Sequence, residues 1–294
     1  MRSRINRAWA AFVLTGATLL AASGCARVDL TNEWPGLAEP TGWEPKAGVC
    51  TDDGFAETSY RASYKPIDCT KSHAYETVFI GQFKDDAAAL PKPPGVGSTA
   101  MTGAWKECDA KTTEYLGGQW RDGRVWFGVS VPSSGSWEGG ARWFRCEVMA
   151  STDRFGEQPQ KLTSSLKGAF GGASDLKYGC YMRPEAEEAE WQPVDCGTKH
   201  NIEYVGSFPA LGERDKIKDD DGYHIKCRSL IAAYAGVPDD GNMKYRAGTY
   251  LSWRNERIWN SGDNWVRCHL WTSTRTLTGS VKGGGTKVLP IQYR

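Results

Sequence analysis

The chain has 294 residues, of which 40% are hydrophobic and 24% are charged, a composition that is typical of folded domains rather than of disordered chains. Its 36 basic and 35 acidic side chains nearly balance, which argues against nucleic acid or a strongly acidic surface as a partner. A chain of this length is expected to form about two domains.

The N-terminus has the pattern of an export signal. Three arginines precede an apolar run from Ala8 to Ala22, and small residues lead to Cys25. The string "LLAASGC" resembles the lipobox of bacterial lipoproteins, in which the cysteine after the glycine is lipidated and becomes the mature N-terminus. We therefore expect residues 1–24 to be a signal peptide and Cys25 to be the lipidation site. Ordinary signal cleavage nearby, or a short uncleaved anchor, is the alternative.

Lipidation would hold the protein on the outer face of the cytoplasmic membrane. The 36 basic side chains less the three arginines of the signal leave 33 against 35 acidic ones, a net charge of −2. Residues 25–45 are rich in Pro, Gly and polar groups, which predicts a flexible tether. No later apolar stretch is long enough to span a bilayer.

After this segment the sequence repeats itself. "PIDCTKSHAYE" (66–76) is matched by "PVDCGTKHNIE" (193–203), and "CDAKTTEYLG" by "CRSLIAAYAG". The matches continue with "WEGGARWFRC" and "WNSGDNWVRC", and then with "LTSSLKG" and "LTGSVKG". We interpret this order as a tandem duplication of residues 46–170, the first copy, and residues 175–285, the second copy. The tail at 286–294 is either frayed or an edge strand.

Each copy reads as a small α+β unit with one main helix and an antiparallel sheet. Apolar residues recur at helical spacing before Gly117 and before Gly236, which are candidate C-caps. The strings "RVWFGVSV" and "WFRCEVM" are rich in β-branched and aromatic residues, which favours strands.

Eight of the nine cysteines remain after Cys25, four in each copy, and an exported protein can keep disulfides. Four cysteines allow three pairings. The spacing within each copy, with the third cysteine on the predicted helix and the fourth on a strand, favours Cys50–Cys69, Cys108–Cys146, Cys180–Cys196 and Cys227–Cys268.

The repeated His and Glu residues are the candidate binding or catalytic residues. His73 and Glu76, with Asp68, or His200 and Glu203, with Asp195, contain the groups of a metal or acid–base site. On an extended segment, however, residues three apart point to opposite faces. We therefore favour a structural role, and we assign no catalytic residue, metal or cofactor.

The 13 tryptophans pose a similar choice between core packing and sugar binding. Those that recur beside cysteines in both copies are expected in the core: Trp137, Trp143, Trp259 and Trp265. Those without a counterpart are expected on the surface: Trp34, Trp43, Trp120 and Trp253. Arg145 and Arg267 are expected to pair with an acid such as Asp68 or Asp195.

In order, the motifs are an early Cys, "VDC" with x3-His-x2-Glu, Cys-x6-Tyr-x-Gly, Trp-x2-Gly-x2-Trp-x-Arg-Cys and "LTGS". The order of these motifs resembles the septum formation-related domain. That domain is found in membrane-attached and lipid-anchored envelope proteins, mainly of high-GC Gram-positive bacteria. The resemblance implies an exported protein associated with the division septum, and it brings no enzymatic activity with it.

Two functions are therefore considered. The first is a non-enzymatic, lipid-anchored protein that binds an envelope or divisome protein or a cell-wall polymer. The second is an envelope hydrolase or metal-dependent enzyme with a site near His73 or His200.

Overall fold

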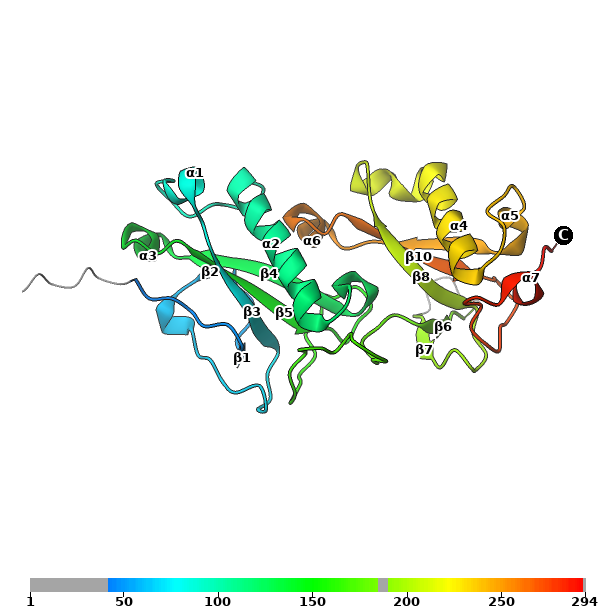
Figure 1. Ribbon diagram of the computed structural model, residues 1–294, viewed down its shortest axis with the longest axis horizontal. Coiled ribbons are helices and arrows are strands. Elements are labelled where there is room, and N and C mark those ends of the chain that lie inside the picture. The colour runs from blue at the N-terminus through cyan, green and yellow to red at the C-terminus, as the bar shows by residue number, and fades with distance from the viewer. Residues whose placement is uncertain (1–41, 185–189, 293–294) are drawn as a thin grey trace, which may run out of the picture. The chain divides into compact units, whose positions relative to one another are not determined.

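The computed structural model describes residues 42–184 and 190–292. The predicted signal peptide, Cys25, Trp34 and most of the predicted tether lie outside these residues. The described chain forms two five-stranded sheets, and a long helix lies across one face of each, α2 on the first sheet and α4 on the second (Figure 1). The α+β class and two similar sheets agree with the sequence prediction, whereas the copy boundaries stay a prediction.

The first sheet has the strand order β1-β3-β5-β4-β2. Its pairs are antiparallel except for the short parallel pair of β2 with β4, which the sequence did not predict. The elements of this copy are β1 (Val49–Thr51), β2 (Thr58–Ser59), η1 (Arg61–Ser63), β3 (Tyr75–Gln82), α1 (Asp85–Ala88), α2 (Thr99–Leu116), η2 (Trp120–Asp122), β4 (Val125–Pro132), α3 (Ser134–Glu138) and β5 (Trp143–Ala150).

The second sheet has the order β7-β6-β8-β10-β9 and is antiparallel throughout. Four of its strands repeat the order of the first sheet, and only the fifth strand joins the opposite edge. The elements are β6 (Cys180–Met182), β7 (Gln192–Val194), β8 (Ile202–Pro209), η3 (Arg214–Asp219), α4 (Asp221–Ala235), α5 (Met243–Arg246), β9 (Gly248–Ser252), α6 (Glu256–Ser261), β10 (Trp265–Trp271) and α7 (Gly285–Val288).

Both long helices end at the glycines that the sequence predicts, and a side chain caps the start of each. The Ser98 side chain accepts the Met101 amide at the start of α2, and the Asp220 side chain accepts the Gly222 amide at the start of α4. Gly117 and Gly236 end the helices with φ of 72° and 71°, a backbone conformation that glycine adopts without steric cost. The sheet-facing residues of α2 recur every three or four positions: Met101, Ala104, Cys108, Thr112 and Leu116.

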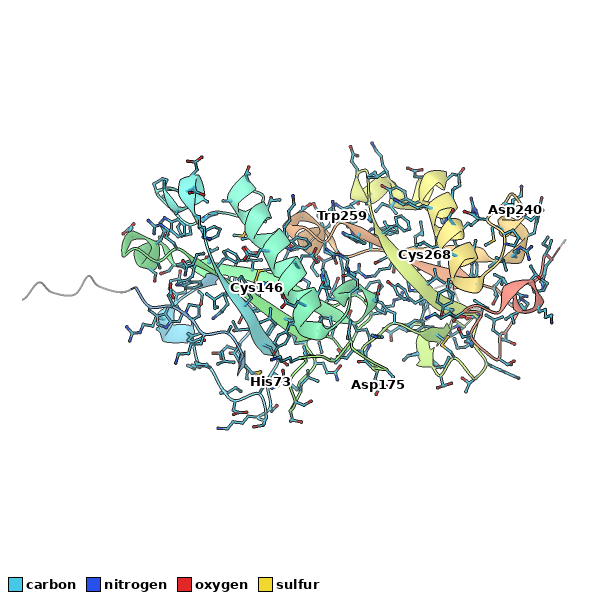
Figure 2. The ribbon with its side chains drawn as sticks, in the orientation of Figure 1. His73, Cys146, Asp175, Asp240, Trp259 and Cys268 are labelled. Atoms are coloured by element: carbon cyan, nitrogen blue, oxygen red, sulfur yellow. A yellow bond between two sulfur atoms is a disulfide. The ribbon has the colours of Figure 1, made fainter. Side chains whose placement is uncertain are left out.

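Four disulfides form, and they join the pairs that the sequence favours. Cys108–Cys146 ties α2 to β5, and Cys227–Cys268 ties α4 to β10, with Cα atoms 5.4 and 5.5 Å apart. The strand cysteines of these two bridges are labelled in Figure 2. Each bridge therefore fastens the helix to an inner strand of the sheet beneath it.

The tryptophan expectation holds in part. Trp137 and Trp143 are buried in the first copy, while Trp259 and Trp265 are half-buried in the second. The expectation for Trp120 was wrong, because this ring is 1% exposed and packs edge-on against Phe127.

The two ends of the described chain pack on the fold. The Trp43 carbonyl, within the predicted tether, accepts the Trp143 indole N–H at 3.0 Å, and the two rings meet edge-on. At the other end, Leu289 is fully buried and its carbonyl accepts Arg246 Nη1 at 2.8 Å. The tail is thus neither frayed nor a strand up to this point. Within the described residues, we find no helix that combines the length and apolar character needed to cross a bilayer.

Candidate functional site

In the first copy, residues from three of the repeated strings meet at the carboxylate of Glu76. This carboxylate accepts the Tyr115 hydroxyl at 2.9 Å, the Ser165 hydroxyl at 2.8 Å and the Leu166 amide at 2.7 Å. His73 Nε2 lies 3.2 Å from the same carboxylate, and His73 Nδ1 lies 2.7 Å from the carbonyl of Lys71. The five groups form one closed hydrogen-bond network.

The second copy builds the same network from the equivalent residues. Glu203 accepts the Tyr234 hydroxyl at 2.6 Å, the Val281 amide at 3.0 Å and the Ser280 hydroxyl. His200 Nδ1 contacts the Thr198 carbonyl at 2.7 Å, but its Nε2 is 3.9 Å from Glu203 and has no hydrogen-bond partner in the described chain. The Glu-centred part of the network is therefore common to both copies, and the His–Glu contact is closer in the first.

His73 and Glu76 converge, so the expectation that they point to opposite faces was wrong. A bend at Ala74 separates the bridge residue His73 from the start of β3 at Tyr75, so the segment is not continuously extended. Asp68 stays outside the network, where it accepts the amide and hydroxyl of Thr70, both at 2.8 Å. The corresponding residue, Asp195, accepts the Gly197 amide at 2.7 Å.

The networks are sealed from solvent. His73, Glu76, His200 and Glu203 are each at most 1% exposed. In each copy the glutamate oxygen and the sulfurs of the first two cysteines lie within 4.8 Å of one another, a grouping that in thiolate form would suit a metal. The cysteines of both groups are disulfide-bonded, so their sulfurs are not thiolate ligands.

The tyrosines of the networks act as neutral hydrogen-bond donors. Burial is the main cause that raises the pKa of Tyr115 to about 12, and it also raises the pKa of Tyr234. A tyrosine that keeps its proton at neutral pH donates to a carboxylate and is a poor proton acceptor. The arrangement therefore suits fixing chain segments together better than acid–base chemistry.

A second buried cluster joins the two copies at Asp263, which lies between α6 and β10. Its carboxylate accepts Arg121 Nε from the first copy at 3.3 Å, Arg254 Nε at 3.3 Å and Arg267 Nη2 at 3.0 Å. Arg254 also donates from Nη2 to the carbonyl of Val125 in the first copy at 2.8 Å. These bonds cross between the copies at a fully enclosed place.

The three arginines around Asp263 keep its carboxylate ionised. Burial by itself would raise the pKa of Asp263, but Arg267, Arg254 and Arg121 together hold it below its ordinary value. Arg267 pairs with an acid, as expected, but naming Asp68 or Asp195 as that acid was wrong. The same holds for Arg145, which pairs with Glu147 at 3.1 Å instead.

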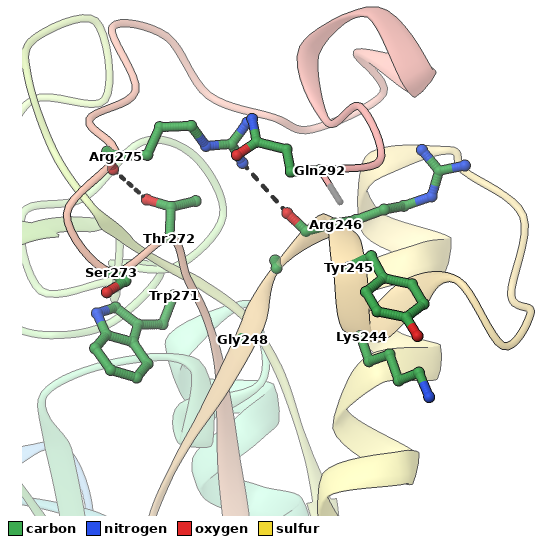
Figure 3. Close-up of a pocket in the computed structure, with 10 residues that line it drawn as sticks. Lys244, Tyr245, Arg246, Gly248, Trp271, Thr272, Ser273, Arg275 and Gln292 are labelled. Carbon is green, nitrogen blue, oxygen red and sulfur yellow. Dashed lines mark hydrogen bonds between the residues drawn. The ribbon is translucent and has the colours of Figure 1, made fainter. Parts of the chain in front are cut away.

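The surface of the second copy carries a hollow of about 460 Å³. Its walls come from α5, the start of β9 and the segment after β10, and Figure 3 shows Trp271 and Arg275 on the side away from α5. The lining residues are Lys244, Tyr245, Arg246, Ala247, Gly248, Trp271, Thr272, Ser273, Arg275 and Gln292. They include three cations and no acid.

Comparison with known protein families decides the relationship. Residues 47–268, most of the chain, match the family described as Septum formation. The chain belongs to the Septum formation family. No curated protein and no solved structure matches it. The family description connects this chain with cell division, as the motif order in the sequence implied.

For this Septum formation family member, the repeats alone pointed to much of the buried network. His, Glu, Tyr and Ser all stand in strings that recur in both copies, although Tyr and Ser were not singled out as site residues. Asp263, Arg121 and Arg254 were missed, and no repeated string marks them as a cluster. The lining of the hollow was also missed, since it is brought together only by the fold.

Proposed function

We propose that this chain is a lipid-anchored, non-enzymatic envelope protein with a binding or scaffold role in septum formation. Membership of the Septum formation family supports the link with cell division. The lipobox-like string that ends at Cys25 supports attachment to the outer face of the cytoplasmic membrane.

The observation that carries the non-enzymatic part is the burial of the repeated His and Glu residues. Each glutamate already accepts three hydrogen bonds from its own copy, and neither histidine is more than 1% exposed. A substrate would have to displace those bonds in order to reach the carboxylates. The same arrangement in both copies supports a structural role. Each copy needs the network in order to fold, whereas a catalytic site would be needed only once.

The localisation experiment uses the full chain fused at its C-terminus to a fluorophore that matures outside the membrane. We expect enrichment at the septum in dividing cells, and we expect the Cys25→Ala version to lose that position. A uniform envelope signal from the unchanged chain would remove the division role. A septal signal that survives Cys25→Ala would remove the lipid anchor instead.

The enzymatic alternative is tested with the double variant His73→Gln and His200→Gln. Glutamine keeps a polar side chain of similar reach but supplies no group that exchanges protons near neutral pH. We expect the double variant, once shown to be folded by circular dichroism, to keep septal enrichment and to complement a deletion strain. Loss of complementation by a folded double variant would favour the enzyme.

A further inference from the structure

The hollow on the second copy concentrates positive charge without a counter-charge. Lys244, Arg246 and Arg275 line it, and within the described residues none of the three forms an ion pair with a carboxylate. Arg246 is 7% exposed, and its Nε has no hydrogen-bond partner in the described chain. Cations that have no carboxylate partner in a concave site favour an anionic ligand.

Arg275 is held in place at one side of this hollow. Its Nη2 donates to the Arg246 carbonyl at 3.3 Å, and its own carbonyl accepts the Thr272 hydroxyl at 2.6 Å, as Figure 3 shows. Burial lowers the pKa of Arg275, and no carboxylate offsets that effect. A guanidinium held in place in this way keeps free N–H groups for a bidentate contact with a phosphate.

The rest of the lining suits a sugar. The half-buried ring of Trp271 forms one wall, and the hydroxyls of Thr272 and Ser273 lie beside it. Ser273 has a φ of 58°, a strained backbone conformation, and its carbonyl accepts Asn201 Nδ2 at 3.1 Å. A volume of about 460 Å³ is large enough for a sugar ring. The apolar face of such a ring would lie on Trp271, and its hydroxyls would meet the few polar groups of the lining.

A second cavity lies next to this hollow. A neighbouring cavity of about 440 Å³ shares Arg275 and adds Lys287 and the hydroxyls of Thr276, Thr278 and Ser280, again with no acid in its lining. Two adjacent cationic hollows that share one arginine fit a chain with repeated charges better than a single small anion.

The first copy does not repeat this surface. Between the last residue of its final strand and its "LTSS" string it has a longer segment, 151–161, where the second copy has 272–276. That segment carries two acids, Asp153 and Glu157, beside two cations, Arg154 and Lys161, and Lys161 is paired with Asp52. The segment 272–276 of the second copy has Arg275 and no acid. The charge difference confines the anion site to the second copy.

We propose that this hollow binds a phosphate-bearing saccharide polymer of the cell envelope. In this site Arg275 contacts a phosphate on one side of the hollow, Lys244 of α5 contacts a phosphate on the other side, and Trp271 contacts the sugar ring. The inference deepens the binding role proposed above and rests on it for the compartment in which the ligand is met.

The test measures binding to the full chain held in phosphatidylcholine nanodiscs by isothermal titration calorimetry. The probe is a glucosylated glycerol-phosphate oligomer, the neutral comparison is a dextran oligomer of equal length, and the lipid comparison is soluble dihexanoyl phosphatidylglycerol. The variants are Arg275→Ala and Lys244→Glu. The exposed Lys92→Glu, in the first copy, makes the same charge change as Lys244→Glu away from the hollow.

We expect the phosphate oligomer to bind, the dextran not to bind, and both pocket variants to bind about tenfold more weakly than the unchanged chain and Lys92→Glu. Lys244 is exposed and lies over the Tyr245 ring, so its variant is expected to fold and reports on the site even if Arg275→Ala is unstable. Equal affinity of all variants would overturn the proposal, and so would equal binding of dextran. Binding of phosphatidylglycerol that is as tight and as dependent on Arg275 would assign the hollow to a lipid headgroup instead.

Because purified protein is used, the result is independent of localisation. Binding without septal enrichment would leave the site in place and remove the division role. Septal enrichment without binding would keep the division role and remove the anion site.

Discussion

The Ser165 hydroxyl donates a 2.8 Å hydrogen bond to Glu76, a residue 89 positions earlier in the chain. Ser280 makes the same contact with Glu203 across 77 positions. A serine from the last string of each copy is thus joined to a glutamate from the first. The repeated Glu, Tyr and Ser residues therefore form the same buried hydrogen-bond network in each copy.

The first prediction concerns this arrangement. Glu76→Ala removes the acceptor for the Tyr115 and Ser165 hydroxyls and for the Leu166 amide, which would remain buried without a partner. We expect a loss of about 2–5 kcal/mol in the free energy of unfolding. Urea denaturation followed by circular dichroism measures it. The exposed Glu107→Ala on α2 is the matched control, with an expected change within about 0.5 kcal/mol. Equal stability of the two variants would contradict the buried role.

The second prediction concerns Asp263. Asp263→Asn leaves three buried guanidinium groups without their shared counter-charge, so we expect a loss of about 3–5 kcal/mol at pH 7. Scanning calorimetry should also show two transitions in place of one, since the bonds between the copies weaken. Asp239→Asn, at an exposed position, should keep a single transition.

The acid dependence of that loss is fixed by the direction of the pKa shift. The folded pKa of Asp263 lies below its ordinary value of 3.8, so its stabilisation is complete above 3.8 and is lost as the pH falls through the lower folded value. The difference in unfolding free energy between the unchanged chain and Asp263→Asn should shrink below pH 3.8. A difference that stays constant down to pH 2 would contradict this account.

The third prediction concerns His269, which is buried among the rings of Trp191 and Tyr204. Burial, with a contribution from Arg154, lowers its pKa from 6.5 to about 3. Between these values the unfolded chain binds a proton that the folded chain does not, so stability falls as the pH drops from 6.5 toward 3. The slope from this one group is about 1.4 kcal/mol per pH unit.

His269→Phe should remove that part of the slope in urea denaturation series between pH 6.5 and 4. Above pH 7 neither state protonates this residue, so the series at pH 7.5 gives the packing effect of the substitution alone. An unchanged slope in the variant would show that His269 does not titrate on unfolding.

The fourth prediction uses two glycines of α2. Gly103 lies inside the helix with open space around it, so Gly103→Ala should raise stability by about 0.5–1 kcal/mol. Gly117 ends the helix at φ 72°, so Gly117→Ala should lower stability by about 1 kcal/mol. Thermal unfolding of both variants measures the opposite signs. A gain from Gly117→Ala would contradict the left-handed helix end.

Much of the fold could be predicted because the same residue patterns occur in both copies. The helix ends at Gly117 and Gly236, and the four disulfides, follow from local patterns and from equal spacing in the two copies. The meeting of His73 with Glu76 could not be predicted, since it depends on a bend at Ala74 that no turn residue announces. Asp263 was hidden for another reason, because its arginine partners come from both copies and only folding brings them to it.

The position of Glu76 within its copy has one further consequence. It stands opposite Cys50 of β1 in the sheet, and it accepts the amide of Leu166 near the end of the same copy. Glu203 stands opposite Cys180 and accepts the amide of Val281. The beginning and the end of each copy are therefore neighbours in space, as in units that tolerate insertion and circular permutation. Two units with this property can follow one another along a chain with only a short join such as "GAFGGAS", because neither unit has to rearrange to admit the other.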